Sequence, residues 1–249
     1  MPPAITRGPS FAVNQPYFFP YLGYFSLISY ADVFVLYDNV EYSKQSWTNR
    51  NRILRGGEVV MITLPLRASP DSTWISNREI AREFTTQKFY RVIEGAYRKA
   101  PYWDQLKEVI QLMEVPESRG LFEFLYRNIS GLCELLGIKT PLLRYSEIVP
   151  DSTRSVGEER IFSVAQALDL KRYVNLPGGQ KLYSRDRFAE RGLALEFLEH
   201  LPRAYTQYRP RDSEPNGSIF ADRLSVLDAI ANVGVTETSN LIRSGFRLV

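Results

Sequence analysis

The sequence predicts an α/β protein with a Rossmann-like, mostly parallel sheet, a helical middle segment and a second α/β lobe. The first sign is a stretch at residues 11–15 that is apolar until Asn14-Gln15, a helix-compatible segment at 23–28 and a β-branched, aromatic run at 33–37. A strand, a helix and a strand in succession favour a right-handed crossover and parallel pairing. The second sign is that strand-like and helix-like segments alternate again after residue 139, which is typical of α/β packing.

The remaining elements follow from hydrophobic periodicity and from the residues that end helices and strands. In the first part we expect a strand at residues 58–65, closed by a proline, and an exposed loop at 67–77. The middle part has helical spacing, and the expected helices are 88–100, 104–113 and 121–136, the last ended by Gly137. The last part is expected to contain strands at 142–145, 172–175 and 194–198, helices at 156–168, 185–191, 226–232 and 237–244, and an irregular stretch at 207–218.

The chain is long enough to bury a substantial core. It has 249 residues, of which 44% are hydrophobic and 24% are charged. No sharp change in composition marks a linker. We therefore expect a single domain at residues 11–249, made of an N-terminal α/β lobe (about 11–80), a helical segment (about 81–138) and a C-terminal α/β lobe (about 139–249).

Charge and cysteine content exclude several classes of protein. The 31 basic and 28 acidic side chains leave a net charge of +3, which is too small and dispersed for a nucleic-acid or membrane footprint. Cys133 is the one cysteine and His200 the one histidine, which rules out an intrachain disulfide framework and a Cys/His metal cluster. A carboxylate-held ion stays open, but we predict neither a metal site nor a cofactor. No segment approaches the roughly 18 apolar residues of a membrane span, so we expect a cytoplasmic protein.

Cys133 lies beside the apolar face of the helix expected at residues 121–136. Free cysteines are commonly buried, and no histidine lies near this one in the sequence. We interpret it as a small buried residue and not as a nucleophile.

Residues 14–24 crowd amide and phenol groups at the expected carboxyl end of the first strand. They read Asn-Gln-Pro-Tyr-Phe-Phe-Pro-Tyr-Leu-Gly-Tyr. Such polar-tipped groups are costly to bury without hydrogen-bond partners. A functional site therefore explains Gln15, Tyr17, Tyr21 and Tyr24 better than core packing alone.

The segment Tyr21-Leu-Gly-Tyr24 has the spacing of the His-x-Gly-His turn of nucleotidylyltransferases and class I synthetases. In those enzymes the histidines help hold triphosphate oxygens, and the glycine lets the nucleotide approach a helix N-terminus. Two phenols donate hydrogen bonds but supply no imidazolium charge. The likeness suggests a nucleotide-binding ancestry with the adenylylation chemistry altered or lost.

Polar residues also follow the second expected strand. Asp38 comes directly after it, where a side chain of an open parallel sheet faces the ligand crevice, and it fits a base, a sugar ligand or a turn cap. Lys44, Trp47, Asn49 and Arg50 follow. They combine cations for a phosphate or carboxylate, a ring for stacking and an amide for orientation. We predict that they bind substrate, although a solvated loop explains Lys44 equally well.

A second group of candidates lies between an expected strand and an expected helix of the C-terminal half. Residues 175–184 read Asn-Leu-Pro-Gly-Gly-Gln-Lys-Leu-Tyr-Ser and lack the ending of a Walker loop. Gly178 and Gly179 can bring backbone N–H groups close to an anionic ligand, and a plain tight turn fits them as well. Lys181 and Tyr183 favour binding.

His200 lies just past the strand expected at residues 194–198. With no second histidine and no fixed Ser or Asp partner, a Ser-His-Asp mechanism has no sequence support. His200 fits either a hydrogen-bonded structural histidine or a general base of near-neutral pKa. Tyr205 and Gln207 add hydrogen-bonding groups in the adjoining loop. Ser225 and Asp228, at the start of the next helix, fit a capping role.

Taken together, these blocks resemble the WbqC-like family of bacterial proteins. The matching stretches span nearly the whole chain: Gln15–Phe25, Val35–Val40, Trp47–Ile53, Leu176–Gly179 with Tyr183, Leu224–Asp228 and Gly245–Val249. Where the resemblance leads us to expect two acids followed by Val-Gln, this chain has Asp38-Asn-Val-Glu41. That departure argues against a strict two-carboxylate metal site.

The resemblance implies acyl, aminoacyl or glycyl transfer to an amino sugar or similar amine, in surface-polysaccharide or specialised-metabolite biosynthesis. It carries over no established catalytic residues, so we assign roles from chemistry. Transfer of this kind needs orientation, an oxyanion donor and a base. We predict Gln15, Tyr21 and Tyr24 for the first two roles and Asp38 or His200 for the third. The expected partners are a small-molecule acceptor and an acyl donor, such as a thioester-loaded carrier protein.

Two other functions stay open. The Tyr21 to Tyr24 spacing favours a nucleotidyltransferase-like enzyme, and the basic, aromatic segment at residues 44–52 fits a non-catalytic module that binds a sugar nucleotide or a carrier protein. All three hypotheses expect residues 14–24 and the Pro-Gly-Gly turn to line opposite walls of one cavity.

Overall fold

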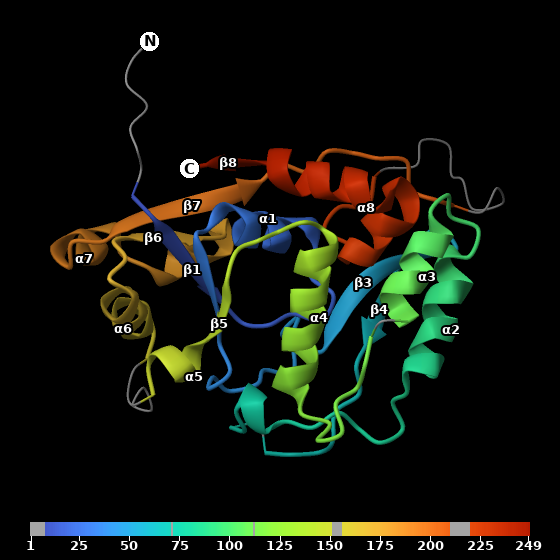
Figure 1. Cartoon of the computed structure of the whole chain (residues 1–249), viewed down its shortest axis with the longest axis horizontal. Coiled ribbons are helices and arrows are strands. Elements are labelled where there is room, and N and C mark those ends of the chain that lie inside the picture. Colours follow the sequence, from blue (N-terminus) through green and yellow to red (C-terminus); the bar gives the residue numbers. More distant parts are fainter. Residues whose placement is uncertain (1–7, 71, 112, 151–155, 210–219) are drawn as a thin grey trace, which may run out of the picture.

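The computed structural model describes residues 8–70, 72–111, 113–150, 156–209 and 220–249, and its centre is a six-stranded sheet (Figure 1). The strand order is β5-β2-β1-β6-β7-β8. The strands are β1 (Ser10–Asn14), β2 (Val33–Leu36), β5 (Leu142–Arg144), β6 (Arg172–Asn175), β7 (Ala194–His200) and β8 (Phe246–Leu248). All pairs are parallel except β7 with β8. The predicted Rossmann-like α/β fold is therefore confirmed, and strands from both ends of the chain share this sheet.

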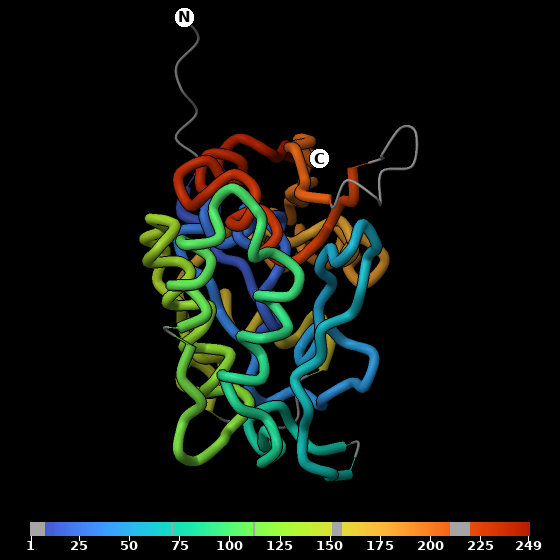
Figure 2. The backbone as a smooth tube through the Cα atoms, turned by 90° about the vertical axis from the view of Figure 1, so that its right-hand side faces the viewer, coloured from blue at the N-terminus to red at the C-terminus, as the bar shows by residue number. Residues whose placement is uncertain are grey.

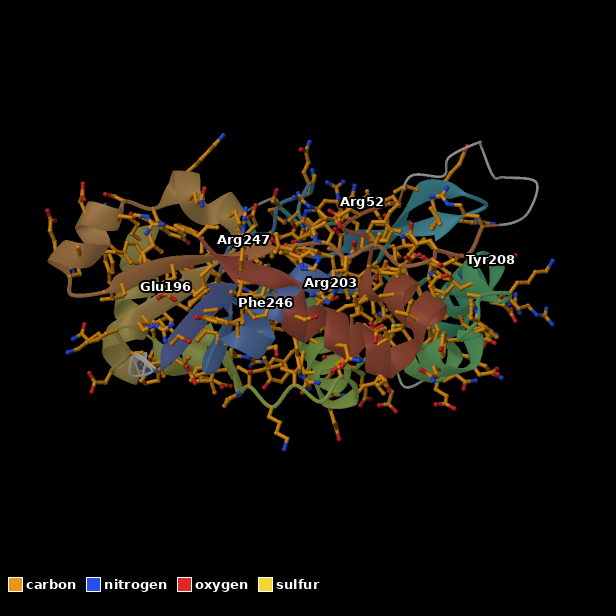
Figure 3. All side chains as sticks on the ribbon, turned by 90° about the horizontal axis from the view of Figure 1, so that it is seen from above. Arg52, Glu196, Arg203, Tyr208, Phe246 and Arg247 are labelled. Carbon is orange, nitrogen blue, oxygen red and sulfur yellow. The ribbon has the colours of Figure 1, made fainter. Side chains whose placement is uncertain are left out.

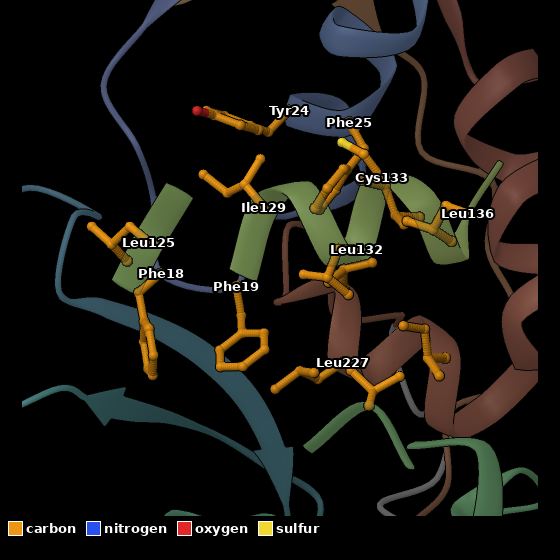
Figure 4. Packing of buried hydrophobic residues seen from close by; sticks show 14 of the residues in the cluster. Phe18, Phe19, Tyr24, Phe25, Leu125, Ile129, Leu132, Cys133, Leu136 and Leu227 are labelled. Carbon is orange, nitrogen blue, oxygen red and sulfur yellow. The ribbon is translucent and has the colours of Figure 1, made fainter. Parts of the chain in front are cut away.

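Helices cover both faces of the sheet because its strands are apolar on both sides. In β1, Phe11 and Val13 belong to one apolar cluster and Ala12 to the other, as the alternation of side chains along a strand requires. One face is covered by α1 (Leu22–Tyr30), α4 (Leu121–Leu135) and α8 (Val226–Ser244), and the other by α5 (Tyr145–Ile148), α6 (Glu158–Leu168) and α7 (Arg185–Glu190). Figure 4 shows the larger cluster, in which Tyr24 and Phe25 of α1 lie beside Ile129 and Cys133 of α4.

The predicted helical middle segment is present, and a small hairpin lies beside it (Figure 2). Its helices are α2 (Thr86–Tyr97), α3 (Trp103–Gln111) and α4. The hairpin pairs β3 (Arg50–Arg55) with the predicted strand β4 (Glu58–Thr63), and its turn uses Gly56 and Gly57 at φ values of 61° and 86°. Residues 50–52, predicted to belong to a binding segment, are thus the start of a strand.

The C-terminal helix is broken where the sequence predicts two helices. Gly234 has φ 76° and ψ 172° inside α8, and a Cβ there would lie 2.7 Å from Cδ1 of Tyr102. Glycine is therefore needed at this position for two reasons: it allows the positive φ, and it leaves room for Tyr102 at the start of α3. Helix α5, strand β8 and two short 3₁₀ turns, η1 (Ile75–Asn77) and η3 (Pro177–Leu182), were not predicted. No helix in the described part of the chain has the length and apolar character needed to span a bilayer.

Candidate functional site

A cavity of about 820 Å³ opens where β1, β2, β6 and β7 end. Strand β1 is the central strand: β2 lies on one side of it, and the chain later returns to add β6 on the other. The strand order reverses at this point, and ligands of open α/β sheets bind in the crevice outside the carboxyl ends of the strands there. We call this space the switch-point cavity. Each of the four strand ends contributes a residue to the lining: Asn14, Tyr37, Asn175 and His200.

The two strands at the switch point end in the same local structure. The Asn14 side-chain oxygen accepts the backbone N–H of Gln15 at 2.8 Å, and the Asn175 oxygen accepts that of Leu176 at 2.8 Å. A proline follows one residue later in both places, and proline keeps the preceding residue extended. The repeated Asn-x-Pro therefore turns both chains outward and opens the crevice between them. Neither asparagine was predicted as a site residue, although the repeat is visible in the sequence.

The structure brings most of the predicted residues of both groups into this one cavity. The predicted residues that line it are Gln15, Tyr17, Tyr21, Trp47, Gly178, Gly179, Tyr183 and His200. The amide- and phenol-rich segment and the Pro-Gly-Gly turn therefore lie around the same space. A Cβ added at Gly178 would meet no atom within 4 Å, so the backbone there borders open room.

Three predicted residues are buried beside the cavity and not in it. The Tyr24 hydroxyl donates to the Gln15 carbonyl oxygen at 2.8 Å, which fixes the turn that carries Gln15. Both oxygens of Asp38 accept hydrogen bonds from Ser146, at 3.1 Å from its backbone nitrogen and 2.6 Å from its hydroxyl. Asn49 joins the Tyr42 hydroxyl to the Leu64 carbonyl. The polar groups of these three side chains are therefore engaged in hydrogen bonds within the protein.

The predicted cations lie outside the lining as well. Lys44 and Lys181 are exposed, and neither belongs to the residues around the cavity. Arg50 donates to the Gln45 carbonyl at 2.6 Å. Other residues of the lining supply the positive charge that was expected from Lys44, Arg50 and Lys181.

Three arginines line the cavity. For two of them, Arg160 and Arg223, nothing in the local sequence predicts a place in the site. Arg52 of β3, Arg160 of α6 and Arg223 before α8 are lining residues. Figure 3 labels Arg52, which belongs to the β3–β4 hairpin, and Arg247, which belongs to β8. Among the described lining residues Glu199 is the one acid, and Arg247 donates to it at 2.6 Å. The lining therefore carries net positive charge.

The phenols of the cavity are protonated hydrogen-bond donors at neutral pH. Burial raises the pKa of Tyr21 to about 12, and burial likewise raises the pKa of Tyr17 and of Tyr183. A buried phenolate is disfavoured because its charge loses hydration. These side chains can therefore donate to an anionic or carbonyl oxygen of a ligand.

His200 is held at the wall of the cavity by close packing. Its ring meets the ring of Tyr21 edge to face, with centroids 6.1 Å apart, and its Nδ1 is buried without a hydrogen-bond partner in the described part of the chain. Burial lowers the pKa of His200 below its ordinary value of 6.5, because desolvation disfavours the imidazolium. The imidazole is thus neutral at pH 7 and able to accept a proton.

Gly23 makes this packing possible, and Gly23→Ala is expected to disturb the site. A Cβ at this position would lie 2.5 Å from Cε2 of Tyr21 and 2.9 Å from Cβ of His200. We expect a loss of about 1–3 kcal/mol in the free energy of unfolding from overpacking, measured by urea denaturation. Gly95→Ala is the matched control, because Gly95 is exposed in α2 with open space around it; it should gain about 0.5–1 kcal/mol. Equal effects of the two variants would contradict this account.

A buried carboxylate holds the segment that carries Arg223. Asp228 accepts hydrogen bonds from the Tyr97 and Tyr205 hydroxyls, each at 2.8 Å, and from the Gln207 amide at 2.9 Å. Gln207 also exchanges two hydrogen bonds of 2.9 Å with the backbone of Ala221. The predicted capping role is confirmed for Ser225, whose side chain caps α8, and is wrong for Asp228, which ties α2, α8 and the loop before Arg223 together.

Metal ligands and reactive thiols do not gather in the described part of the chain. The described residues contain no group of three or more His, Cys, Asp or Glu side chains that could hold a metal ion. Cys133 is buried in α4, and burial raises its pKa to about 12, so the predicted role as a small core residue fits its surroundings.

The fold and the site define a Rossmann-like α/β protein with a basic, phenol-lined ligand cavity at its switch point. Comparison with known proteins gives the family: the model of the WbqC-like protein family matches residues 15–240, and the chain belongs to this family. The chain is also 26% identical over 232 residues to "Uncharacterized protein Rv1507c" of Mycobacterium tuberculosis (strain ATCC 25618 / H37Rv), covering 90% of this chain and 93% of that protein. No solved structure is significantly similar to this chain.

Proposed function

We propose that this protein is an acyl or aminoacyl transferase that modifies an amino sugar or a similar amine bound in the switch-point cavity. The observation that carries the proposal is a neutral histidine at the wall of a cavity that also presents protonated phenols. Acyl transfer to an amine needs a base for the attacking nitrogen and donors for the oxyanion. His200 supplies the first and Tyr21, its ring neighbour, the second.

The proposed reaction needs no oxidant and no group beyond donor and acceptor. His200 takes a proton from the acceptor ammonium, and the freed nitrogen attacks the carbonyl carbon of an acyl thioester. The C–N bond forms, Tyr21 donates a hydrogen bond to the tetrahedral oxyanion, and the C–S bond breaks with the electron pair leaving on sulfur. The proton held by His200 then passes to the thiolate, and the nitrogen of the new C–N bond releases its second proton to solvent, giving an amide, a thiol and one free proton.

Features of the cavity rim fit an acyl donor. Val156 and Leu182 line the cavity and are 76% and 70% exposed. Exposed large apolar side chains at the edge of a polar site can contact an apolar part of a ligand. We propose that they contact the donor, whether it is a free thioester or a thioester on a carrier protein, and that the reaction takes place in the cytoplasm.

A direct transfer assay tests this function. The purified protein is incubated with glycyl or acetyl thioesters and a panel of amino sugars and their phosphate esters, and products are separated by liquid chromatography and identified by mass. An acceptor that gains one glycyl or acetyl group, with release of one thiol, is the expected result. Tight binding of an acceptor without turnover of any donor would instead favour the non-catalytic binding module.

Nucleotidyl transfer is a second candidate that the cavity supports less well. Its motivation is the Tyr21-x-x-Tyr24 spacing, but the Tyr24 side chain is fully buried and its hydroxyl is used by Gln15. The second position of the motif therefore does not reach the cavity. Release of pyrophosphate from a nucleoside triphosphate, dependent on the acceptor, would reverse this preference.

A further inference from the structure

Two arginines are held together on one wall of the switch-point cavity. Nη2 of Arg52 donates to the backbone oxygen of Arg223 at 3.1 Å, and both residues line the cavity. Arg223 has φ 54°, a left-handed conformation that costs a non-glycine residue about 1–2 kcal/mol. The conformation is maintained by the surrounding contacts: Ser225 donates from its backbone to the Arg52 carbonyl at 2.8 Å, and the Asp228 network anchors the preceding loop.

The charge of this pair is poorly neutralised within the described part of the protein. Arg52 has no carboxylate partner there, and its Nε is buried without a hydrogen bond. Arg223 contacts Oδ2 of Asp222 at 3.5 Å, but their side chains are 73% and 35% exposed, so solvent screens the pair. Glu199, the acid of the lining, is engaged by Arg247. An anionic group of a ligand would supply the negative charge that the two guanidinium groups lack.

We infer that Arg52 and Arg223 form a phosphate subsite, so that the substrate of the switch-point cavity is a phosphate ester. This inference rests on the proposed function, because it names the class of substrate for the same cavity. Arginine guanidinium groups match the several oxygens of a phosphate or diphosphate, and two arginines line this cavity and are joined by a hydrogen bond. The Trp47 ring, whose centroid lies 5.4 Å from the Arg52 guanidinium carbon, offers a flat face next to this subsite.

The position of the subsite defines how the ligand lies. Tyr21 and His200 lie beside this subsite, because Tyr21 pairs in an isolated β-bridge with Ser225, two residues after Arg223, and the Tyr21 ring contacts the His200 ring. The phosphate therefore lies beside Tyr21 and His200, and Val156, Leu182 and Tyr183 line the same cavity from the segments before α6 and at the end of η3. A cavity of about 820 Å³ has room for more than a phosphate alone, as expected for a sugar nucleotide or for a phosphate-bearing thioester such as a coenzyme A conjugate.

Calorimetric titration at low ionic strength tests the subsite without any turnover. The probes are UDP-N-acetylglucosamine and coenzyme A, with uridine and N-acetylglucosamine as phosphate-free counterparts. We expect at least one phosphate-bearing probe to bind and both counterparts to fail. Arg52→Gln and Arg223→Gln should each weaken that binding by about tenfold to hundredfold, the size of one charge-assisted hydrogen bond. Binding of the sugar nucleotide assigns the phosphate to the acceptor, and binding of coenzyme A assigns it to the donor.

Arg55→Gln is the matched control, because Arg55 lies on the same strand as Arg52 but is exposed and outside the lining. It should leave the dissociation constant unchanged. Arg223→Gln covers the risk that Arg52→Gln shifts the loop, since the Arg223 side chain contacts only its neighbour Asp222 among the described ion pairs, and circular dichroism checks the fold of both. Equal binding of uridine, unchanged affinity in the two variants, or no binding of either phosphate-bearing probe would overturn the subsite. Acyl transfer to a phosphate-free amine would then leave the proposed function standing.

Discussion

Replacing His200 by glutamine is expected to reduce the turnover number for acyl transfer by about 10²–10⁴, the range for loss of a positioned general base. Glutamine fills a similar volume and can hydrogen bond, but it cannot accept the proton of an attacking amine. The Michaelis constant for the acceptor should change little, because the ligand-binding groups stay in place. Steady-state kinetics with the substrates identified in the transfer assay measure both parameters.

The pH dependence of the rate distinguishes a general base from a structural residue at position 200, because only the loss of a base removes the acidic limb of the profile. Since burial lowers the pKa of His200 below 6.5, the base form predominates at neutral pH, and protonation removes it only as the pH falls. We expect the rate to be level near pH 7 and to fall on the acidic side, at a pH below 6.5, in the wild type. The residual activity of His200→Gln should lack this acidic limb.

Asp38→Asn is the matched comparison for the His200 variant. Asp38 was the other predicted base, but its oxygens are bound by Ser146 outside the cavity. We expect Asp38→Asn to keep the turnover number within a fewfold of the wild type and to lose a modest amount of stability. If Asp38→Asn lost as much activity as His200→Gln, the assignment of the base would have to be reversed.

Removing the Asp228 carboxylate is expected to have the largest effect on stability. Asp228→Ala leaves two buried phenols and an amide without their acceptor, and the free energy of unfolding should fall by about 3–5 kcal/mol. The melting temperature should fall by about 10 °C for a chain of this size. The burial that raises the pKa of Asp228 also means that the carboxylate loses hydration in the folded state, which keeps the loss below the full sum of three unsatisfied donors.

Two variants locate the origin of this effect. Asp228→Asn keeps one acceptor oxygen and should lose less stability than Asp228→Ala. Asp104→Ala removes an exposed acid from the first turn of α3 and should cost at most about 1 kcal/mol. Urea and thermal denaturation of the three proteins provide the comparison. A loss in Asp228→Ala no greater than in Asp104→Ala would show that the network contributes little.

The fold could be predicted from sequence because its strands are short apolar runs with clear endings. The strands at residues 10–14 and 172–175 both stop before an x-Pro pair, and Gly137 and Gly192 follow helices at positive φ. Strand β3 was missed because its polar side chains alternate with buried ones and resembled a binding segment. The local sequence pattern therefore identified the elements whose buried residues are apolar. It failed for β3, where polar residues occupy a strand.

The candidate site could be predicted only in part, because the direction of a side chain depends on elements far along the chain. Asp38 follows a strand at the crevice edge, yet Ser146 of the unpredicted helix α5 binds it. Arg160 and Arg223 reach the cavity from segments that nothing in the local sequence links to it. Gln15, Tyr21 and His200 do line the cavity; they were chosen because amide and phenol groups crowd after the first strand and because the chain has one histidine.

The pairing of β1 with β6 has a consequence for the order of events during synthesis. Ser10 and Phe11 pair with Arg172 and Tyr173, so β1 pairs with β2 early but waits for its second partner until the later part of the polypeptide is made. Such distant pairing slows folding because a long loop must close first. The crevice between these strands cannot exist on a nascent chain that stops before residue 172. A ribosome-bound fragment ending there should fail to bind any ligand that the complete protein retains.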